Sequence, residues 1–112
     1  LNQWAPIGTW TIWQHAATLN APQGRIVFRF HARDVNLVMG PAEPGTSVPF
    51  RVSLDGVAPL DEHGVDVDEQ GDGAVTDQRL YQLIRQVGHV EDRLFQVEFG
   101  DAGVEAYSFT FG

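Results

Sequence analysis

The chain has 112 residues, enough for one domain with a single core, and 43% of them are hydrophobic, which excludes an intrinsically disordered chain. The formal net charge of −8 argues against binding to nucleic acid or to an anionic membrane surface, because both depend on positive charge. Cysteine is absent, so disulfides and thiolate metal sites play no part in the fold.

The first half of the chain is predicted to form short strands. Along Arg25–Ala32, the apolar residues Ile26, Phe28 and Phe30 occupy every second position, a period typical of strands with one buried face. The other face carries arginine and histidine, which donate hydrogen bonds and indicate a surface for a polar ligand. The strands predicted here are Thr9–Trp13, Ala16–Leu19, Arg25–Ala32 and Val35–Met39.

The second half continues this pattern between turns. Residues 40–45 have the composition of a turn, and Asp55-Gly56 predicts a tight one. Residues 79–86 fit a strand or a short helix, since Leu80, Leu83 and Ile84 have helical spacing, and the strand is favoured because the neighbouring segments are strands. The predicted strands are Pro49–Leu54, Arg79–Gln86, Leu94–Phe99 and Val104–Phe111, with an irregular segment at Val57–Asp77.

These elements predict an all-β fold, a two-sheet antiparallel β-sandwich of jelly-roll type, as a single domain over residues 1–112. No apolar run approaches the roughly 18–20 residues that cross a bilayer. The chain begins at Leu1 rather than Met, which we interpret as one module of a longer protein. Alternation places Tyr107 on the same face as Phe109 and Phe111, and the predicted core is Phe28, Phe30, Phe50, Phe95, Phe99, Phe109 and Phe111.

The acidic segment 66–77 resembles the calcium loop of an EF-hand. Gln70 stands where Asp or Asn is usual, Asp77 is shorter than the usual Glu, and no helix is predicted before the loop. The alternative is a solvated hairpin turn in which Gly71 and Gly73 supply positive φ angles. The candidate calcium ligands are Asp66, Asp68, Gln70, Asp72 and Asp77.

A second group of side chains fits a sugar-binding cavity, if the segment 57–78 folds back over the sheet. Imidazole, guanidinium, carboxylate and phenol groups supply hydrogen bonds to hydroxyls and a ring for the apolar face of a pyranose. The alternative is that each residue serves the structure, with Arg33 paired to Asp34 or Asp55. The candidate ligand-binding residues are His31, Arg33, His63, Asp66, Arg79 and Tyr81.

Three tryptophans lie near the start of the chain. Trp10 and Trp13 fall on opposite faces of one predicted strand, so at most one of them belongs to the core. An exposed tryptophan is a common platform for carbohydrate and also a common plug at the open end of a sandwich. For Trp4 the plug is the favoured interpretation.

Catalysis has little support in the sequence, so we expect a domain that is not an enzyme. The serines Ser47, Ser53 and Ser108 lie in strand or turn contexts without a nucleophile elbow. The histidines are too far apart in sequence to indicate a shared metal site. They are His15, His31, His63 and His89.

Several blocks of this sequence resemble the C-terminal extension of bacterial DipZ-type thiol-disulfide interchange proteins and related thioredoxin-like chains. The blocks are Trp4 with Gly8-Thr9-Trp10-Thr11, FRFHARDVNLVMGP (28–41), FRVSLDG (50–56), HGVDVDEQGDG (63–73), RLYQLIRQ (79–86), DRLFQVEF (92–99) and GVEAYSFTFG (103–112). The resemblance implies a β-sandwich like a carbohydrate-binding module or galactose-binding domain. It also implies a membrane-anchored parent chain with an extracytoplasmic thioredoxin-like domain that carries the redox Cys-x-x-Cys pair upstream.

Two functions from different classes follow from these observations. In the first, the domain is a non-catalytic module that binds a carbohydrate or another polar small ligand and brings the thioredoxin-like partner to a glycan. In the second, the same polar face docks onto the thioredoxin-like domain or a protein target, as a structural module. Calcium would stabilise the acidic loop in a variant of either hypothesis.

Overall fold

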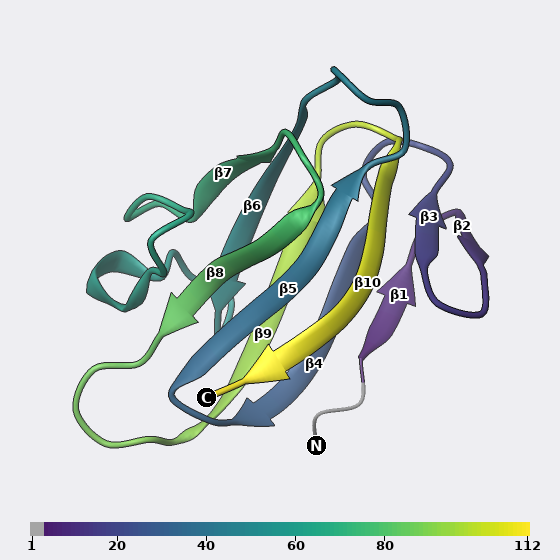
Figure 1. Ribbon diagram of the computed structural model, residues 1–112. Helices are drawn as coiled ribbons and strands as arrows, with labels where there is room; N and C mark the ends of the chain where they lie inside the picture. Colours follow the sequence, from purple (N-terminus) through teal and green to yellow (C-terminus); the bar gives the residue numbers. More distant parts are fainter. Residues whose placement is uncertain (1–3) are drawn as a thin grey trace.

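The computed structural model describes residues 4–112 and contains two antiparallel sheets packed face to face (Figure 1). One sheet has the order β1-β4-β9-β6-β7 and the other the order β2-β3-β10-β5-β8. The predicted all-β sandwich is therefore confirmed. The strands of the described part are β1 Ala5–Ile7, β2 Trp10–Ile12, β3 Ala17–Leu19, β4 Arg25–His31, β5 Asp34–Pro41, β6 Val48–Leu54, β7 Asp72–Val75, β8 Arg79–Arg85, β9 Asp92–Phe99 and β10 Val104–Phe111, with a short 3₁₀ turn η1 at Leu60–Glu62.

Strand β8 decides between the two interpretations of residues 79–86. It is a strand, and the helical alternative is wrong. The pairing with β5 matches Ile84 to Val35 and Gln82 to Asn36, so Leu83 is left without a partner in a bulge. As a result, the consecutive residues Leu83 and Ile84 are both buried, which imitates the spacing of a helix.

The core lies between the sheets and consists largely of phenylalanine. The Phe28 ring lies 4.7 Å from that of Phe109 and 5.1 Å from that of Phe95, centroid to centroid. Burial of each ring contributes about 1.5–3 kcal/mol to the free energy of unfolding. Five of the seven predicted core phenylalanines are buried, with exposed fractions of 0–4%, and Phe109 and Phe111 are partly buried against the same cluster.

The two edges of the sandwich are closed in different ways. At one edge the chain passes from β1, which pairs with β4, to β2, which pairs with β3, so the first described strands belong to different sheets. At the other edge the segment 57–71 runs along β8, where the Gly64 amide donates to the Leu83 carbonyl at 2.8 Å. An isolated bridge joins His63 to Ile84. This segment covers hydrogen-bonding groups that an edge strand would otherwise expose.

Glycines allow the segment 57–71 to lie this close to the sheet. Gly71 has a φ of +90°, and a Cβ there would lie 2.1 Å from the Val52 carbonyl oxygen. The positive φ predicted for Gly71 is confirmed, whereas that predicted for Gly73 is wrong. A Cβ at Gly73 would instead meet the Phe50 ring at 2.6 Å, so close approach is what requires glycine there.

No helix among residues 4–112 is long and apolar enough to span a membrane.

Candidate functional site

The six predicted ligand-binding residues do not form one cavity: His31 ends β4 in one sheet, and the other five lie along or near β8 in the other sheet. Arg33 donates to the carbonyls of Gln86 and Gly88, just past one end of β8. Arg79 is the first residue of β8, opposite Met39. At about 3.3 Å per residue, the two ends of this strand are roughly 20 Å apart. No single small ligand contacts both arginines.

Asp66, Arg79 and Tyr81 are the three that come together. The Arg79 guanidinium donates to Asp66 Oδ1 at 2.9 Å, and its Cζ lies 3.8 Å from the centre of the Tyr81 ring. The Gln82 amide donates to Asp66 Oδ2 at 2.7 Å. Burial opposes ionisation of Asp66, but the hydrogen bonds from Arg79 and Gln82 outweigh it and lower the pKa of the carboxyl. This contact fastens the segment 57–71 to β8.

Tyr81 is a core residue, which corrects its assignment as a ring for stacking on a sugar. Its exposed fraction is 0%. Its hydroxyl donates to the Asp77 carbonyl at 2.7 Å and accepts from the Thr76 amide at 3.1 Å, so its hydrogen-bonding capacity serves the β7–β8 turn. Tyr81 shares the inward face of β8 with Leu83, and only its tip is polar.

The two predicted histidines also have local partners. His31 ends β4, is exposed, and its Nδ1 lies 2.5 Å from Asp92 Oδ1. His63 is half-buried beside β8, and its Nδ1 lies 2.8 Å from the Gly64 carbonyl oxygen. Neither imidazole belongs to a cluster of three or more histidine or acidic side chains within residues 4–112.

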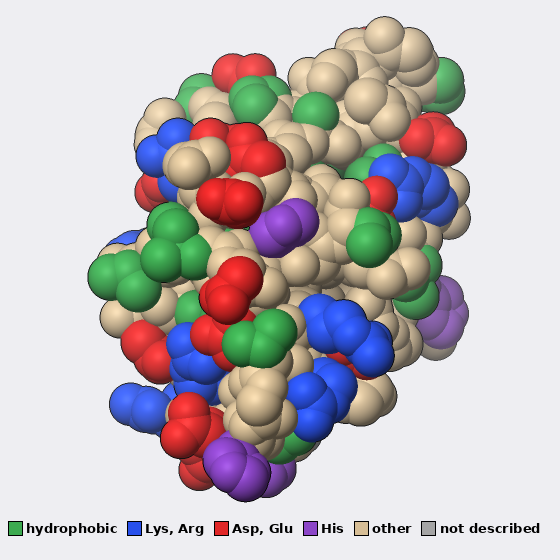
Figure 2. Space-filling view, turned by 90° about the vertical axis from the view of Figure 1, so that its left-hand side faces the viewer, with side chains coloured by type: hydrophobic (Ala, Val, Ile, Leu, Met, Phe, Trp, Pro, Cys, Tyr) green, Lys and Arg blue, Asp and Glu red, His purple; other side chains and the backbone are tan. Residues whose placement is uncertain are grey.

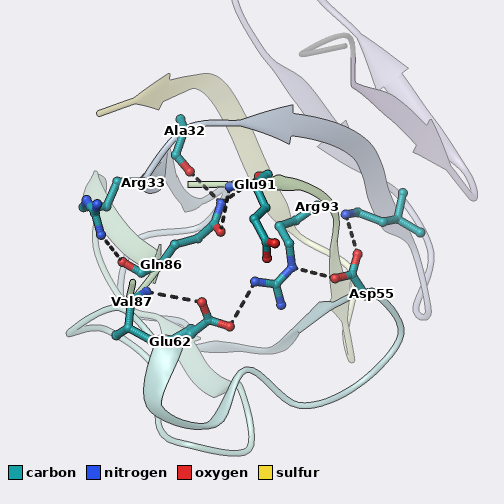
Figure 3. Close-up of polar contacts among 9 residues, drawn as sticks. Ala32, Arg33, Asp55, Glu62, Gln86, Val87, Glu91 and Arg93 are labelled. Atoms are coloured by element: carbon teal, nitrogen blue, oxygen red, sulfur yellow. Dashed lines mark hydrogen bonds and ion pairs between the residues drawn. The ribbon is translucent and has the colours of Figure 1, made fainter. Parts of the chain in front are cut away.

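Arg33 belongs to a polar network that closes one end of the sandwich (Figure 3). At its centre is Gln86, 1% exposed, whose side-chain amide donates to the carbonyls of Ala32 and Glu91 at 2.9 and 3.0 Å. Arg33 Nη1 donates to the Gln86 carbonyl at 2.7 Å. Every buried side-chain polar atom of the described residues has a partner, so the network is structural.

Arg93 extends the network to the segment 57–71 (Figure 3). Its Nε donates to Asp55 Oδ2 at 2.5 Å and its Nη1 to Glu62 Oε1 at 3.0 Å. Asp34 pairs instead with Arg85 at 3.1 Å. The predicted pairing of Arg33 with Asp34 or Asp55 is therefore wrong, since other arginines hold both carboxylates.

The predicted calcium ligands also point to separate partners. Asp68 Oδ1 accepts the amides of Gln70 and Asp72, at 3.0 and 2.9 Å, in a local turn. Asp72 pairs with Arg51 at 2.6 Å, and Asp77 Oδ1 accepts the Thr76 hydroxyl at 2.9 Å. The Gln70 side chain is exposed, and no three metal-ligating side chains gather within residues 4–112. The geometry is that of the hairpin turn, with Asp68 organising the backbone.

The outer face of the β4–β9–β6–β7 sheet is not a basic patch, although the alternation along β4 suggested one. The pairing register places Arg25 opposite Glu98, Glu98 opposite Arg51, and Arg51 opposite Asp72. Charges of opposite sign thus alternate across four strands. The same mixture covers the edge formed by β7, β8 and η1, where acidic, basic and apolar side chains are interspersed (Figure 2).

A groove of about 370 Å³ lies at the opposite edge, beside β2, β3 and β10. Trp13 lies on it and is 60% exposed, the most exposed aromatic side chain of the described residues. Hydrogen-bonding groups lie beside the indole, so the groove combines an aromatic ring with polar side chains, as predicted for residues along β8. The aromatic and polar residues that line the groove are Trp4, Trp13, Gln14, His15, Tyr107 and Ser108.

Local hydrogen bonds hold Trp13 in place. The Trp13 amide donates to the Ala16 carbonyl at 2.7 Å, which closes the turn between β2 and β3. The indole Nε1 donates to Thr18 Oγ1 at 2.9 Å, and the Thr18 hydroxyl donates to Glu105 Oε2 at 3.3 Å. A ring that is fixed in this way loses little conformational entropy when a ligand stacks on it.

Trp4 and Trp10 are partly buried and pack against the core. The Trp4 ring meets Phe109 edge-on at 5.4 Å and packs against the core, as expected for a plug, although it also lines the groove. Trp10 packs against Phe99 at 6.0 Å. The prediction that at most one of Trp10 and Trp13 is in the core is confirmed, and the outward one is Trp13.

None of the six predicted ligand-binding residues lines the groove, and Tyr107 is a groove residue whose position was predicted wrongly. Alternation placed it inward with Phe109, but β10 contains a bulge between Ala106 and Ser108, so Tyr107 lines the groove instead. Its hydroxyl lies 3.3 Å from both Glu105 Oε1 and Gln78 Oε1. Burial, followed by the negative charge of Glu105, raises the pKa of this hydroxyl.

Comparison with known proteins identifies the family. The family described as "Thioredoxin like C-terminal domain" matches residues 1–112. The chain belongs to this family. The thioredoxin-like C-terminal domain resemblance is confirmed, and the DipZ-type assignment stays a prediction. No curated protein matches this sequence.

Solved structures with a similar fold include two carbohydrate esterases of family two. The enzyme from Clostridium thermocellum, in complex with cellohexaose, has a TM-score of 0.72 and 12% identity over 98% of this chain. The enzyme from Cellvibrio japonicus has a TM-score of 0.57 and 11% identity over 97% of it. This chain covers only 31% and 32% of those two proteins, so the likeness concerns the fold alone.

Proposed function

We propose that this thioredoxin-like C-terminal domain is a non-catalytic module that binds carbohydrate in the Trp13 groove. The observation that carries the proposal is an exposed indole, held by its own hydrogen bond, beside the polar side chains of the groove. An aromatic face covers the apolar face of a pyranose, while side chains such as Gln14, His15 and Ser108 hydrogen-bond its hydroxyls.

This proposal moves the ligand away from the predicted site along β8. There, the polar side chains form hydrogen bonds with other groups of the protein, as seen for Asp66, Arg79 and Arg33, and Tyr81 is buried. The groove residues, in contrast, include side chains that face solvent. A fold-sharing esterase was solved with cellohexaose, which adds support for testing glucans first.

The proposed setting is an extracytoplasmic, membrane-anchored thioredoxin-like protein. In that setting the module would bring the thiol-disulfide chemistry of its neighbour close to glycan-bearing targets. The domain contains no cysteine, so it contributes no thiol of its own. A shallow, open groove of this kind fits weak binding, in the range of about micromolar to millimolar Kd.

The test is a titration of the 112-residue chain with cellohexaose and with N-acetylglucosamine oligomers, followed by NMR. We expect saturable shifts at the groove, lost in Trp13→Ala and largely kept in Trp13→Tyr, which retains an aromatic ring. Leu60→Ala, which shortens an apolar side chain that is 56% exposed in η1, serves as the matched control. Absence of binding to either saccharide at about 10 mM would refute the proposal.

Docking to the thioredoxin-like domain is the second candidate, and one observation favours it. The segment 57–65 exposes three apolar side chains, Val57, Leu60 and Val65, at 64, 56 and 77%. Exposed apolar groups of this kind often mark protein interfaces. In a two-domain protein, docking predicts amide-exchange protection of this segment that is lost in Leu60→Asp, and equal exchange with and without the neighbour would exclude it.

A further inference from the structure

Glu105 is a carboxylate next to the Trp13 groove, and it has no ion-pair partner among residues 4–112. It lies on β10 opposite Thr18 of β3 and Gly40 of β5. Its two oxygens accept from neutral hydroxyls, those of Thr18 and Tyr107, both at 3.3 Å. The space above Gly40 is taken by the neutral Gln78 side chain.

The ion pairs of the described residues lie elsewhere. None of them includes Glu105, although it is half-buried, where an opposite charge would stabilise it. The arginines with ion-pair partners within residues 4–112 are Arg51, Arg79, Arg85 and Arg93, and their carboxylates are Asp72, Asp66, Asp77, Asp34, Asp55 and Glu62.

The negative charge of Glu105 acts on a residue that lines the groove. It raises the pKa of Tyr107, which lines the groove, in addition to the effect of burial. Glu105 is also two hydrogen bonds away from the indole of Trp13, through Thr18. The face of an indole attracts cations by its quadrupole, so the aromatic platform and the carboxylate favour ligands of the same charge.

We propose that the Trp13 groove prefers saccharides that carry a protonated amine over neutral or acidic ones, with Glu105 as the group that sets this preference. The proposal rests on the carbohydrate-binding function proposed above and names its substrate class. A ligand ammonium beside the groove would give Glu105 a counter-charge that none of the described residues supplies. The net charge of −8 acts in the same direction at longer range.

The test compares glucosamine oligomers with N-acetylglucosamine oligomers of equal length, at a pH low enough to keep the amine of the glucosamine oligomer protonated. We expect the wild-type chain to bind the amine-bearing oligomer about fivefold more tightly, equivalent to ~1 kcal/mol. Glu105→Gln, which keeps the hydrogen-bond acceptor, should remove most of this preference, and an unchanged preference would overturn the role of Glu105. Asp61→Asn removes an exposed acid from η1 and should keep the preference.

The outcomes separate this proposal from the one on which it rests. Equal affinities, or tighter binding of the acetylated oligomer, would overturn the amine preference and leave carbohydrate binding intact. No binding of either oligomer would overturn the amine preference, and no binding of cellohexaose as well would overturn the carbohydrate-binding function. If Glu105→Gln folds poorly, the wild type still gives an answer: between about 0.02 and 0.3 M salt, affinity should fall for the amine oligomer and stay constant for the acetylated one. Equal salt dependence would overturn the preference.

Discussion

Replacement of Asp66 by alanine should loosen the segment 57–71 and destabilise the whole domain. The Asp66 carboxylate is 17% exposed and holds two donors, the Arg79 guanidinium at 2.9 Å and the Gln82 amide at 2.7 Å. A hydrogen bond to a charged group contributes ~1.5–3 kcal/mol, whereas a pair with a partly exposed arginine contributes about 0.5–1 kcal/mol. Asp66→Ala should therefore lower the free energy of unfolding by about 2–3 kcal/mol.

The pH dependence gives this prediction a distinct signature. Folding lowers the pKa of Asp66 below its ordinary value of 3.8, because the hydrogen bonds from Arg79 and Gln82 outweigh desolvation. Its stabilising effect is thus fully present above the unfolded-state pKa and is lost as the pH falls through the folded-state pKa. The stability difference between wild type and Asp66→Ala should be constant at neutral pH and shrink below about pH 4.

Urea unfolding followed by tryptophan fluorescence measures the effect at several pH values. Asp61→Asn is the control, since Asp61 is an exposed acid of the same segment and forms no ion pair among the described residues. A loss for Asp66→Ala of less than about 0.5 kcal/mol, or one that persists unchanged at pH 3, would refute the role of this carboxylate as the anchor of the segment.

Three further predictions concern the same edge and the core. Gly71→Ala should lower the free energy of unfolding in urea by at least about 2 kcal/mol, because its Cβ would lie 2.1 Å from the Val52 carbonyl oxygen at a φ of +90°. A neutral effect would contradict this close approach. Tyr81→Phe should lose about 1–2 kcal/mol of stability through the Thr76 and Asp77 contacts and leave saccharide affinity unchanged, whereas a selective loss of affinity would restore Tyr81 to the site. Millimolar calcium should leave the melting temperature unchanged relative to a chelator, since the candidate ligands hold separate partners, and a rise with saturation would reinstate the calcium loop.

The fold could be predicted from the sequence because alternation along β4, β6 and β9 reports the buried face of each strand directly. The positions of Tyr81 and Tyr107 were predicted wrongly, for two different reasons. Tyr107 follows the alternation of β10 only up to the bulge after Ala106. Tyr81 has a polar hydroxyl, but its partners are backbone groups of its own turn, and nothing in the local pattern distinguishes them from a ligand.

For the candidate site, the sequence predicts the types of side chain but not their positions. The sequence indicates one outward tryptophan, but which of Trp10 and Trp13 it is depends on how β2 pairs at the sheet edge. The partners of Arg33 and Asp66 depend on where the segment 57–71 lies, and its path along β8 is set by contacts between residues distant in sequence. A composition of rings, imidazoles and acids therefore indicates a class of ligand, but it does not indicate where on the fold that ligand would bind.

The indole N–H signals in ¹⁵N-resolved NMR, recorded during titration with saccharide, test carbohydrate binding at the groove most directly. The Trp13 signal should move saturably with the amine-bearing and acetylated oligomers, while the Trp10 signal, from a ring packed on Phe99, stays in place. A Trp13 signal that does not respond, while amides around Asp66 and Arg79 shift, would place the ligand on β8 and contradict the assignment.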